Sequence, residues 1–395
     1  MTISKKIKDF MEQGSWIRKM FEEGEALKQT VGKDNIYDLS LGNPVISPPK
    51  EFYIKLRELA SDPIDGMHRY MPNSGYPETR SAVAKQLKNE TGLNFDSSHL
   101  IMTVGAGGAL NVVMKTILDA GDEVIIFAPY FVEYIFYADN HNAKCRVVNS
   151  DSNFVPKLHE LENAITPKTK MILICSPGNP TGVIYKPETL SAISNILSTK
   201  EKELGTEITL VSDEPYRKII FDNIDYPHIF NYHHKSIVAT SHSKDLSIPG
   251  ERIGYIAVNP NYKNTKEIID GLTFCNRTLG FVNAPALMQR IIASLQNVAI
   301  DVSDYERKRD FLFTELRKIG YSVVKPDGAF YMFPKSPTPD EIPFVEELKA
   351  QRVLVVPGTG FGTPGHFRIA YCVEDYVLQN SIVGFKKAFE KSKPS

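Results

Sequence analysis

Residues 171–182 read MILICSPGNPTG, and this stretch decides which kind of fold the chain can adopt. Its first five residues are continuously apolar, which is typical of a strand buried on both faces of a parallel sheet. The residues after Cys175 predict a turn, because proline, glycine and asparagine all interrupt regular structure. The stretch therefore indicates a central strand whose carboxyl end carries a rigid loop.

Six further stretches have the same apolar, β-branched character, and helical patterns alternate with several of them. The seven expected strands are His99–Val104, Glu123–Ala128, Cys145–Val148, Lys170–Ser176, Ile208–Ser212, Ser236–Thr240 and Ile253–Val258. Helices are expected at Gly107–Leu118, Phe131–Asn140 and Pro187–Ser198. This alternation predicts an α/β protein with a mostly parallel, seven-stranded sheet sandwiched by helices. Ligands of such sheets bind beyond the carboxyl ends of the strands.

The two flanks of the chain follow a different pattern. We expect one amphipathic helix at Ser15–Gln29, followed by an extended segment at Asn43–Pro49. Later helices are expected at Pro285–Leu295, Asp304–Ile319 and Glu374–Lys391, with short strands at Ser322–Val324, Ala329–Phe333, Val353–Val356 and His366–Tyr371. We therefore predict a large domain of residues 46–284. Residues 1–45 and 285–395 are expected to form a smaller α+β domain from both termini.

Composition and charge exclude several classes of protein. The 395 residues carry 46 basic and 47 acidic side chains, so nothing favours a nucleic-acid or membrane partner. No apolar run approaches the roughly 18 residues that a membrane helix needs, and we expect no secretory signal. The four cysteines are far apart and form no CxxC motif, so they are interpreted as reduced thiols. We expect a cytoplasmic, globular protein.

Two glycine- and proline-rich motifs follow expected strands, and each has a simpler explanation when taken alone. Gly105-Ala106-Gly107-Gly108 opens a helix, where backbone N–H groups can bind a phosphate. A tight strand-to-helix turn would need the same glycines. Asn179 lies between prolines and either offers its amide to a ligand or belongs to a plain loop.

Two charged motifs also follow strands. Asp213 and Tyr216 come after Ile208–Ser212, and a buried aspartate needs a cation or a ring N–H unless it caps the next helix. Ser241-His242-Ser243-Lys244 precedes Arg252 by a few residues. Hydroxyls and a guanidinium can clamp one phosphate, and the lysine can form an imine with an aldehyde. A solvated loop lysine is the plainer explanation.

Together the four motifs predict one ligand, pyridoxal 5′-phosphate. This cofactor combines a phosphate, a pyridine nitrogen, a ring hydroxyl and an aldehyde, and enzymes bind it through a lysine Schiff base and an aspartate at the pyridine nitrogen. Lys244 and Asp213 match that pair. The glycines at 105–108, which follow an expected strand and open a helix, do not have the GxGxxG spacing, and this argues against a nicotinamide oxidoreductase.

These motifs resemble those of the class I/II, fold-type-I pyridoxal-phosphate aminotransferases of the aspartate aminotransferase superfamily. The resemblance runs from Leu39–Pro44 to Phe367–Ala370 and is most specific in Asn179–Gly182 and Ser241–Tyr255. It implies an enzyme that moves an amino group from an L-amino acid to a 2-oxo acid. The implied mechanism is ping-pong and uses a lysine Schiff base with pyridoxal phosphate.

The resemblance also implies a role for each matching residue. Lys244 would be the Schiff-base lysine and proton-transfer base, Asp213 would keep the pyridine nitrogen protonated, and Tyr216 would bond the ring hydroxyl. The other implied cofactor contacts are Asn179 at the ring hydroxyl, Phe131 on the ring, and Ala106, Gly107, Ser241, Ser243 and Arg252 at the phosphate. Tyr70 would reach the phosphate of the neighbouring subunit, which implies a homodimer. Gly42, Asn179 and Arg368 would bind the substrate carboxylate.

The reaction and the substrate stay open at this point. The same fold hosts C–S β-lyases, decarboxylases and aminocyclopropane-type synthases. A dicarboxylic donor would need a second cation, for which Lys115, Arg277 and Arg69 are the candidates. Alternatively, an aromatic or branched side chain would fit a pocket lined by Tyr130, Tyr134, Phe330 and Tyr331. We expect aspartate or glutamate slightly ahead of these as donor, with 2-oxoglutarate as acceptor.

Three histidines need a separate interpretation. His242 stands where the family more often has phenylalanine or leucine, and we expect it to be a spacer that points away from the site. His233 and His234 are adjacent and lack the spacing of metal ligands, so we expect no metal site.

Overall fold

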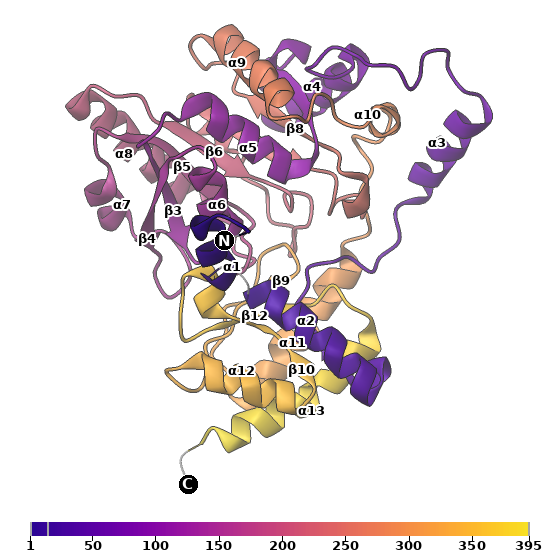
Figure 1. Ribbon diagram of the computed structural model, residues 1–395, viewed down its shortest axis with the longest axis vertical. Helices are drawn as coiled ribbons and strands as arrows, with labels where there is room; N and C mark the ends of the chain where they lie inside the picture. Colours follow the sequence, from indigo (N-terminus) through magenta and orange to yellow (C-terminus); the bar gives the residue numbers. More distant parts are fainter. Residues whose placement is uncertain (1, 14–15, 394–395) are drawn as a thin grey trace.

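The computed structural model describes residues 2–13 and 16–393, which pack into two regions (Figure 1). The upper region of the view contains a sheet covered by helices. The lower region contains helix α2 (Trp16–Val31) from the start of the chain and helix α13 (Asp375–Lys391) from its end. No helix within the described residues is long and apolar enough to cross a membrane.

The sheet of the upper region has seven strands in the order β2-β8-β7-β6-β5-β3-β4. They are β2 (Leu100–Thr103), β3 (Glu123–Ala128), β4 (Lys144–Asn149), β5 (Thr169–Cys175), β6 (Thr209–Asp213), β7 (Ser236–Ser241) and β8 (Gly254–Val258). All seven predicted strands are present, and the α/β prediction is confirmed. Strand β8 alone runs antiparallel to its neighbours β2 and β7.

The antiparallel direction of β8 agrees with a connection that contains no α-helix. A parallel crossover needs a dozen or more residues and usually a helix, whereas antiparallel neighbours need only a short loop. Residues 242–253 join β7 to β8 with no more than the short 3-10 helix η4 (Pro249–Glu251). This loop begins with the segment that contains Lys244 and ends next to Arg252, so the reversal of β8 brings both residues back to the same edge.

Both faces of the sheet are covered, as the continuous apolar runs predict. In β5, Met171 and Leu173 face one apolar cluster while Ile172 and Ile174 face another. Helices α5 (Gly105–Ile117), α6 (Glu133–Asp139) and α9 (Thr265–Thr278) cover the first face. Helices α3 (Lys50–Ser61), α4 (Pro77–Thr91), α7 (Leu158–Ala164), α8 (Pro187–Leu204) and α10 (Ala286–Ile292) cover the second.

The lower region contains two small sheets and the terminal helices. Strand β1 (Tyr37–Asp38) pairs in parallel with β10 (Val353–Leu354), which joins the two ends of the chain. The antiparallel strands β11 (Val356–Pro357), β12 (Phe367–Ala370) and β9 (Tyr331–Met332) form the second sheet. Helices α11 (Ser303–Ile319), α12 (Glu341–Ala350) and α13 pack with these strands around one apolar cluster.

Several sequence predictions for the flanks are wrong in detail. The helix expected at Ser15–Gln29 is present as α2, which continues to Val31, and its predicted start at Ser15 lies outside the described residues. Helix α1 (Lys5–Gln13) is a further helix that the sequence pattern does not predict. Residues 322–324 form no strand, and Val353–Val356 is divided between β10 and β11 in different sheets. Strand β9 begins only at Tyr331, because Ala329 has a φ of 58° that an extended strand does not allow.

The division into domains stays a proposal. The apolar cluster of the lower region contains Leu39 together with residues of α11, α12 and α13, which supports a small domain built from both termini. Met288, Ile291 and Ile292 of α10, however, pack into a cluster of the large sheet. We therefore propose that the boundary lies after α10 rather than at residue 285.

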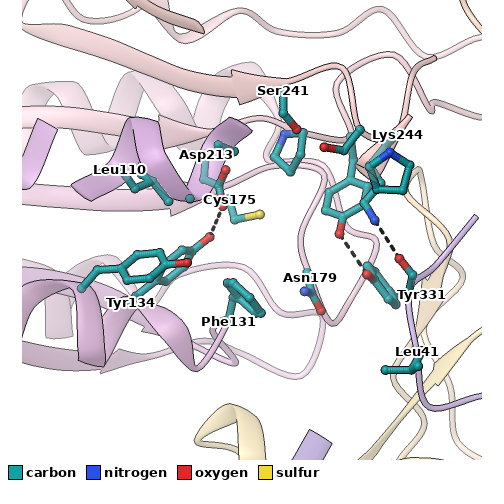
Figure 2. Close-up of a pocket in the computed structure, with 18 of the residues that line it drawn as sticks. Leu41, Leu110, Phe131, Tyr134, Cys175, Asn179, Asp213, Ser241, Lys244 and Tyr331 are labelled. Atoms are coloured by element: carbon teal, nitrogen blue, oxygen red, sulfur yellow. Dashed lines mark hydrogen bonds between the residues drawn. The ribbon is translucent and has the colours of Figure 1, made fainter. Parts of the chain in front are cut away.

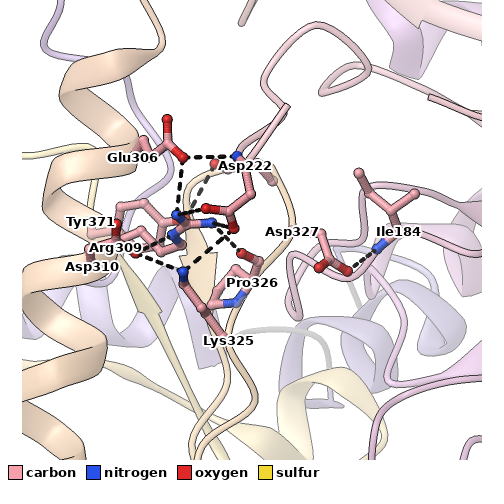
Figure 3. A network of polar contacts seen from close by, with 10 residues as sticks. Ile184, Asp222, Glu306, Arg309, Asp310, Lys325, Pro326, Asp327 and Tyr371 are labelled. Atoms are coloured by element: carbon pink, nitrogen blue, oxygen red, sulfur yellow. Dashed lines mark hydrogen bonds and ion pairs between the residues drawn. The ribbon is translucent and has the colours of Figure 1, made fainter. Parts of the chain in front are cut away.

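The two regions meet at a network of charges and backbone bonds (Figure 3). Arg309 of α11 is fully buried, and its guanidinium donates to both carboxylate oxygens of Asp222 at 2.8 and 3.0 Å. It also donates to the Pro326 carbonyl at 3.0 Å. Next to it, Gly182 has a φ of 71°, and a Cβ there would lie 2.6 Å from Pro326. Only glycine fits at this position, where the two regions meet. The absence of a side chain lets the Ser176–Gly182 loop pack directly against Pro326.

Replacing Arg309 with methionine should lower the free energy of unfolding by about 2–3 kcal/mol, because Asp222 loses both hydrogen bonds from the guanidinium and keeps only Lys325 at 3.5 Å, and the Pro326 carbonyl loses its donor. Urea titration of the purified protein measures this change. Arg307→Met is the control, since Arg307 is half-exposed on the same helix and pairs with Asp304 and Asp375 at the surface. Its loss should stay below about 1 kcal/mol. If both variants lose the same free energy of unfolding, the buried contacts of Arg309 do not stabilise the protein more than a surface ion pair does.

Candidate active site

A cavity of about 330 Å³ lies where the carboxyl ends of β5, β6 and β7 face the lower region (Figure 2). It is lined by Leu41, Gly42, Ala106, Gly107, Leu110, Phe131, Tyr134, Tyr137, Cys175, Asn179, Asp213, Pro215, Tyr216, Ser241, Ser243, Lys244, Pro249, Arg252, Tyr331 and Arg368. Every site residue expected from the sequence is among them except Tyr70. The structure therefore brings the four motifs together, while the role of each residue stays a prediction.

Lys244 lines this cavity from the loop that leaves β7. Its Nζ donates to the Gly42 carbonyl at 2.7 Å and lies 5.3 Å from the centre of the Phe330 ring. Burial lowers the pKa of Lys244 to about 8, and the positive charges of Arg368 and Arg252 act in the same direction. A substantial fraction of this amine is neutral near pH 8 and can act as nucleophile or base.

Asp213 ends β6 and is buried with one oxygen free. Its Oδ2 accepts a hydrogen bond of 2.6 Å from the Tyr134 hydroxyl, whereas its Oδ1 is buried without any partner in the described structure. Burial raises the pKa of Asp213 to about 7, although the bond from Tyr134 opposes the rise. A buried oxygen without a donor is costly, and a ring N–H from a ligand would satisfy it.

The contact of Tyr134 with Asp213 is not predictable from the motifs. Sequence reasoning offers Tyr134 as a wall for a substrate side chain, but its hydroxyl is committed to the aspartate. Of the other three candidates for such a wall, only Tyr331 lines the cavity. Its hydroxyl lies 2.9 Å from that of Tyr216.

One end of the cavity has the properties of an anion site. Helix α5 begins there at Gly105, and its first turn has no side-chain cap. Arg252 is held at a φ of 53°, a strained backbone for a residue other than glycine, and its guanidinium lies 3.0 Å from where a Cβ on Gly105 would be. The hydroxyls of Ser241 and Ser243 line the same cavity. Free helix N–H groups, hydroxyls and a guanidinium together bind phosphate well.

Arg368 of β12 marks the opposite end. Its Nη1 donates to Asn179 Oδ1 at 3.0 Å and its Nη2 to the Ser40 carbonyl at 2.5 Å, while Nε has no partner within the described residues. The guanidinium lies against the rings of Tyr331 and Phe361 at 4.7 and 4.8 Å. Burial lowers its pKa, but an arginine keeps its charge. A guanidinium fixed in this way has the chemistry to bind a carboxylate.

The remaining sequence candidates lie elsewhere. Tyr70 is 90% exposed and contributes nothing to the cavity of its own chain. Lys115, Arg277 and Arg69 do not line the cavity either. His242 is buried outside the cavity lining, with Nδ1 3.1 Å from Asp245 Oδ2.

The cavity fits pyridoxal 5′-phosphate on its own chemistry. The anion site suits the phosphate, the unpartnered Oδ1 of Asp213 suits the pyridine N–H, and the amine of Lys244, whose pKa is lowered to about 8, suits the aldehyde. Arg368 is then left for the carboxylate of a substrate. No single one of these features would identify the ligand, but one cavity supplies all of them.

Comparisons with known proteins agree with this fit. The family described as aminotransferase class I and II matches residues 35–382. The chain belongs to this family. A probable aspartate aminotransferase of Methanocaldococcus jannaschii is 32% identical over 89% of this chain and 93% of its own length. A probable aspartate/prephenate aminotransferase of Thermus aquaticus is 34% identical over 82% of this chain and 85% of its own. The crystal structure of an aminotransferase from Eubacterium rectale has a TM-score of 0.96 and 38% identity, covering all of both chains.

Membership of the class I and II aminotransferases establishes the general activity. The protein is a pyridoxal-phosphate-dependent aminotransferase of the fold-type-I class, as its sequence resemblance predicts. Pyridoxal 5′-phosphate is its cofactor, and amino acids and 2-oxo acids are its substrates.

The rate at which the cofactor-free enzyme combines with pyridoxal 5′-phosphate should rise with pH, with a midpoint near 8. Only the neutral amine attacks an aldehyde, and it predominates above the pKa of Lys244, which burial lowers to about 8. Stopped-flow absorbance measures the rate, and Nα-acetyl-lysine in solution is the comparison, with a midpoint near 10.4. A profile of the enzyme that coincides with that of free lysine would contradict the lowered pKa.

Proposed function

We propose that this aminotransferase works by a ping-pong mechanism in which Lys244 moves the proton at the α-carbon of the substrate. The observation that carries the proposal is that the amine of Lys244, whose pKa is lowered to about 8, shares one cavity with the free oxygen of Asp213 and the fixed guanidinium of Arg368. Arg368 holds the α-carboxylate, so it orients the Cα–H bond toward the amine. Both half-reactions use the same cavity, which is why the first product leaves before the second substrate binds.

Pyridoxal 5′-phosphate supplies an aldehyde for the amino group and a ring that withdraws electrons from the α-carbon. The protein supplies the rest. Asp213, when ionised, holds the ring nitrogen in its protonated form, and Tyr134 fixes the carboxylate for that contact. Asn179 and Tyr216 are proposed to bond the ring hydroxyl, and Phe131 to stack on the ring.

For the donor, we propose aspartate or glutamate, with 2-oxoglutarate as acceptor. The names of the relatives support an acidic donor, since both include aspartate. The cavity itself contains only three cationic side chains in the described chain, Arg252, Lys244 and Arg368, and the cofactor and the α-carboxylate use them all. A second carboxylate therefore needs a cation from outside this lining.

The neighbouring subunit is the proposed source of that cation. We propose a cytoplasmic homodimer in which the exposed segment His68–Met71 enters the neighbouring cavity, with Tyr70 at the phosphate. Tyr70 is almost fully exposed, as an unpaired interface residue would be. Arg69 is adjacent to it and is also exposed, and among the residues that the structure describes its only ion pair is with Asp65 at 3.6 Å. Arg69 is therefore the candidate for the distal carboxylate.

A second candidate function is transamination of aromatic amino acids. Phe131 and Tyr331 line the cavity and present apolar ring faces to a substrate side chain. An aromatic donor needs no second cation. The two candidate functions therefore differ in whether binding of the donor depends on Arg69.

Replacing Lys244 with alanine should abolish the visible absorbance of the lysine-bound cofactor and lower turnover about 10³-fold or more, because both nucleophile and base are lost. Absorbance spectra and a coupled 2-oxo acid assay measure the two effects. Asp213→Ala should keep some cofactor but lose most of the rate. Lys115→Ala is the control, since Lys115 is exposed at the last turn of α5. If Lys244→Ala transaminates like the wild type, the assignment is wrong.

A screen of the first half-reaction with twenty amino acids should show the fastest conversion of the cofactor to pyridoxamine phosphate with aspartate and glutamate. Arg69→Gln should raise KM for these two about tenfold or more, as expected for losing a charged contact, and leave phenylalanine unchanged. Faster conversion with aromatic amino acids, insensitive to Arg69→Gln, would favour the second candidate. Release of pyruvate and ammonia without pyridoxamine phosphate would indicate a β-lyase.

A further inference from the structure

Tyr137 contacts the first turn of α5, and no motif in the sequence points to this contact. It belongs to α6 and lines the same cavity as Lys244. A Cβ placed on Gly107 would lie 3.0 Å from the Tyr137 hydroxyl and 3.8 Å from the ring carbon that bears it. The hydroxyl therefore lies over a residue that has no side chain, at the end of the helix where N–H groups are free.

The Tyr137 hydroxyl differs from those of the other tyrosines around the cavity. Tyr134 donates to Asp213, and the hydroxyls of Tyr216 and Tyr331 bond to each other. Within residues 2–13 and 16–393, Tyr137 is the one tyrosine of the cavity whose hydroxyl has no hydrogen-bond partner. A largely buried tyrosine usually pairs its hydroxyl, so this donor faces the cavity with its bond unmade.

The charges around Tyr137 keep its proton in place. Burial raises the pKa of Tyr137 to about 12, and the carboxylates of Glu133 and Asp213 act in the same direction, against the guanidinium of Arg252. At neutral pH the residue is therefore a hydrogen-bond donor. Arg252 lies at the same helix end, next to Gly105. A tyrosine O–H and a guanidinium thus lie near the free N–H groups of α5.

We propose that Tyr137 donates its hydroxyl proton to a phosphate oxygen of pyridoxal 5′-phosphate and so completes the anion site formed by the first turn of α5, Ser241, Ser243 and Arg252. The inference rests on the assignment of the cofactor to this cavity. It also gives a reason for glycine at position 107, because a side chain there would displace the hydroxyl. Tyr70 is proposed to contact the phosphate in the neighbouring subunit, whereas Tyr137 contacts the phosphate bound in its own chain.

The test compares pyridoxal 5′-phosphate with pyridoxal, which lacks the phosphate. Cofactor-free wild-type enzyme and Tyr137→Phe are titrated with each compound by absorbance and by quenching of protein fluorescence. A hydrogen bond to a charged group corresponds to about a tenfold to hundredfold change in affinity. We expect Tyr137→Phe to weaken pyridoxal 5′-phosphate by that factor and pyridoxal by less than about twofold, and to shift the ³¹P resonance of the bound phosphate.

Two control variants separate this role from others. Tyr134 lies on the same helix, but its hydroxyl donates to Asp213. Tyr134→Phe should therefore change the affinity for both compounds by the same factor. Tyr376→Phe removes a half-exposed hydroxyl on α13 and should change neither. A loss in Tyr137→Phe that is equal for the two compounds would overturn the inference in favour of a structural role. An unchanged affinity for pyridoxal 5′-phosphate would overturn it directly.

Gly107→Ala provides a second, independent variant. Its Cβ is expected to push the hydroxyl away, so it should weaken pyridoxal 5′-phosphate strongly in the wild type and less in the Tyr137→Phe background. Additive losses would contradict a contact at this point. Failure of the wild-type enzyme to bind pyridoxal 5′-phosphate at all would instead overturn the cofactor assignment, and with it the inference.

Discussion

Asp213 is buried at the carboxyl end of β6, and within the described part of the chain only one of its two oxygens is hydrogen-bonded; the site depends on this arrangement. Such an unsatisfied acceptor costs roughly 1–3 kcal/mol. The sheet can support that cost because its central strands are buried on both faces and pack two apolar clusters. The result is an acceptor held rigidly before any ligand arrives, at the edge where β5, β6 and β7 all end.

The lower region is equally necessary to the site. The Lys244 amine donates to the backbone of Gly42, and Arg368 bonds to Asn179 and to the backbone of Ser40. Leu39 to Gly42 follow β1, which is positioned by its pairing with β10 near the other end of the chain. The cavity therefore exists only when both ends of the chain have folded against the sheet. This explains why the seam at Gly182 and Arg309 is so closely packed.

Sequence alone predicted the features that depend on neighbours along the chain. The apolar runs identified all seven strands, and the turn residues after them identified the residues that the cavity brings together. Tyr134 and Tyr137 were missed in their observed positions because their contacts depend on how α6 packs. Tyr134 reaches an aspartate 79 positions away, and periodicity on a seven-residue helix carries no information about that partner. Likewise, the split of residues 353–356 between two sheets depends on which chain segments pair with them.

The balance of charge in the cavity also connects ligand binding to proton movement. Three cationic side chains line it, against one ionisable carboxylate, Asp213. Two of those cations, Arg368 and Arg252, lower the pKa of Lys244, adding to the larger effect of burial. An anion at either end offsets the charge of the nearest arginine, so it removes part of the effect that lowers the pKa of Lys244. The lysine therefore binds a proton more readily once a phosphate and a carboxylate are in place, which is the condition under which a base at this position has to accept one.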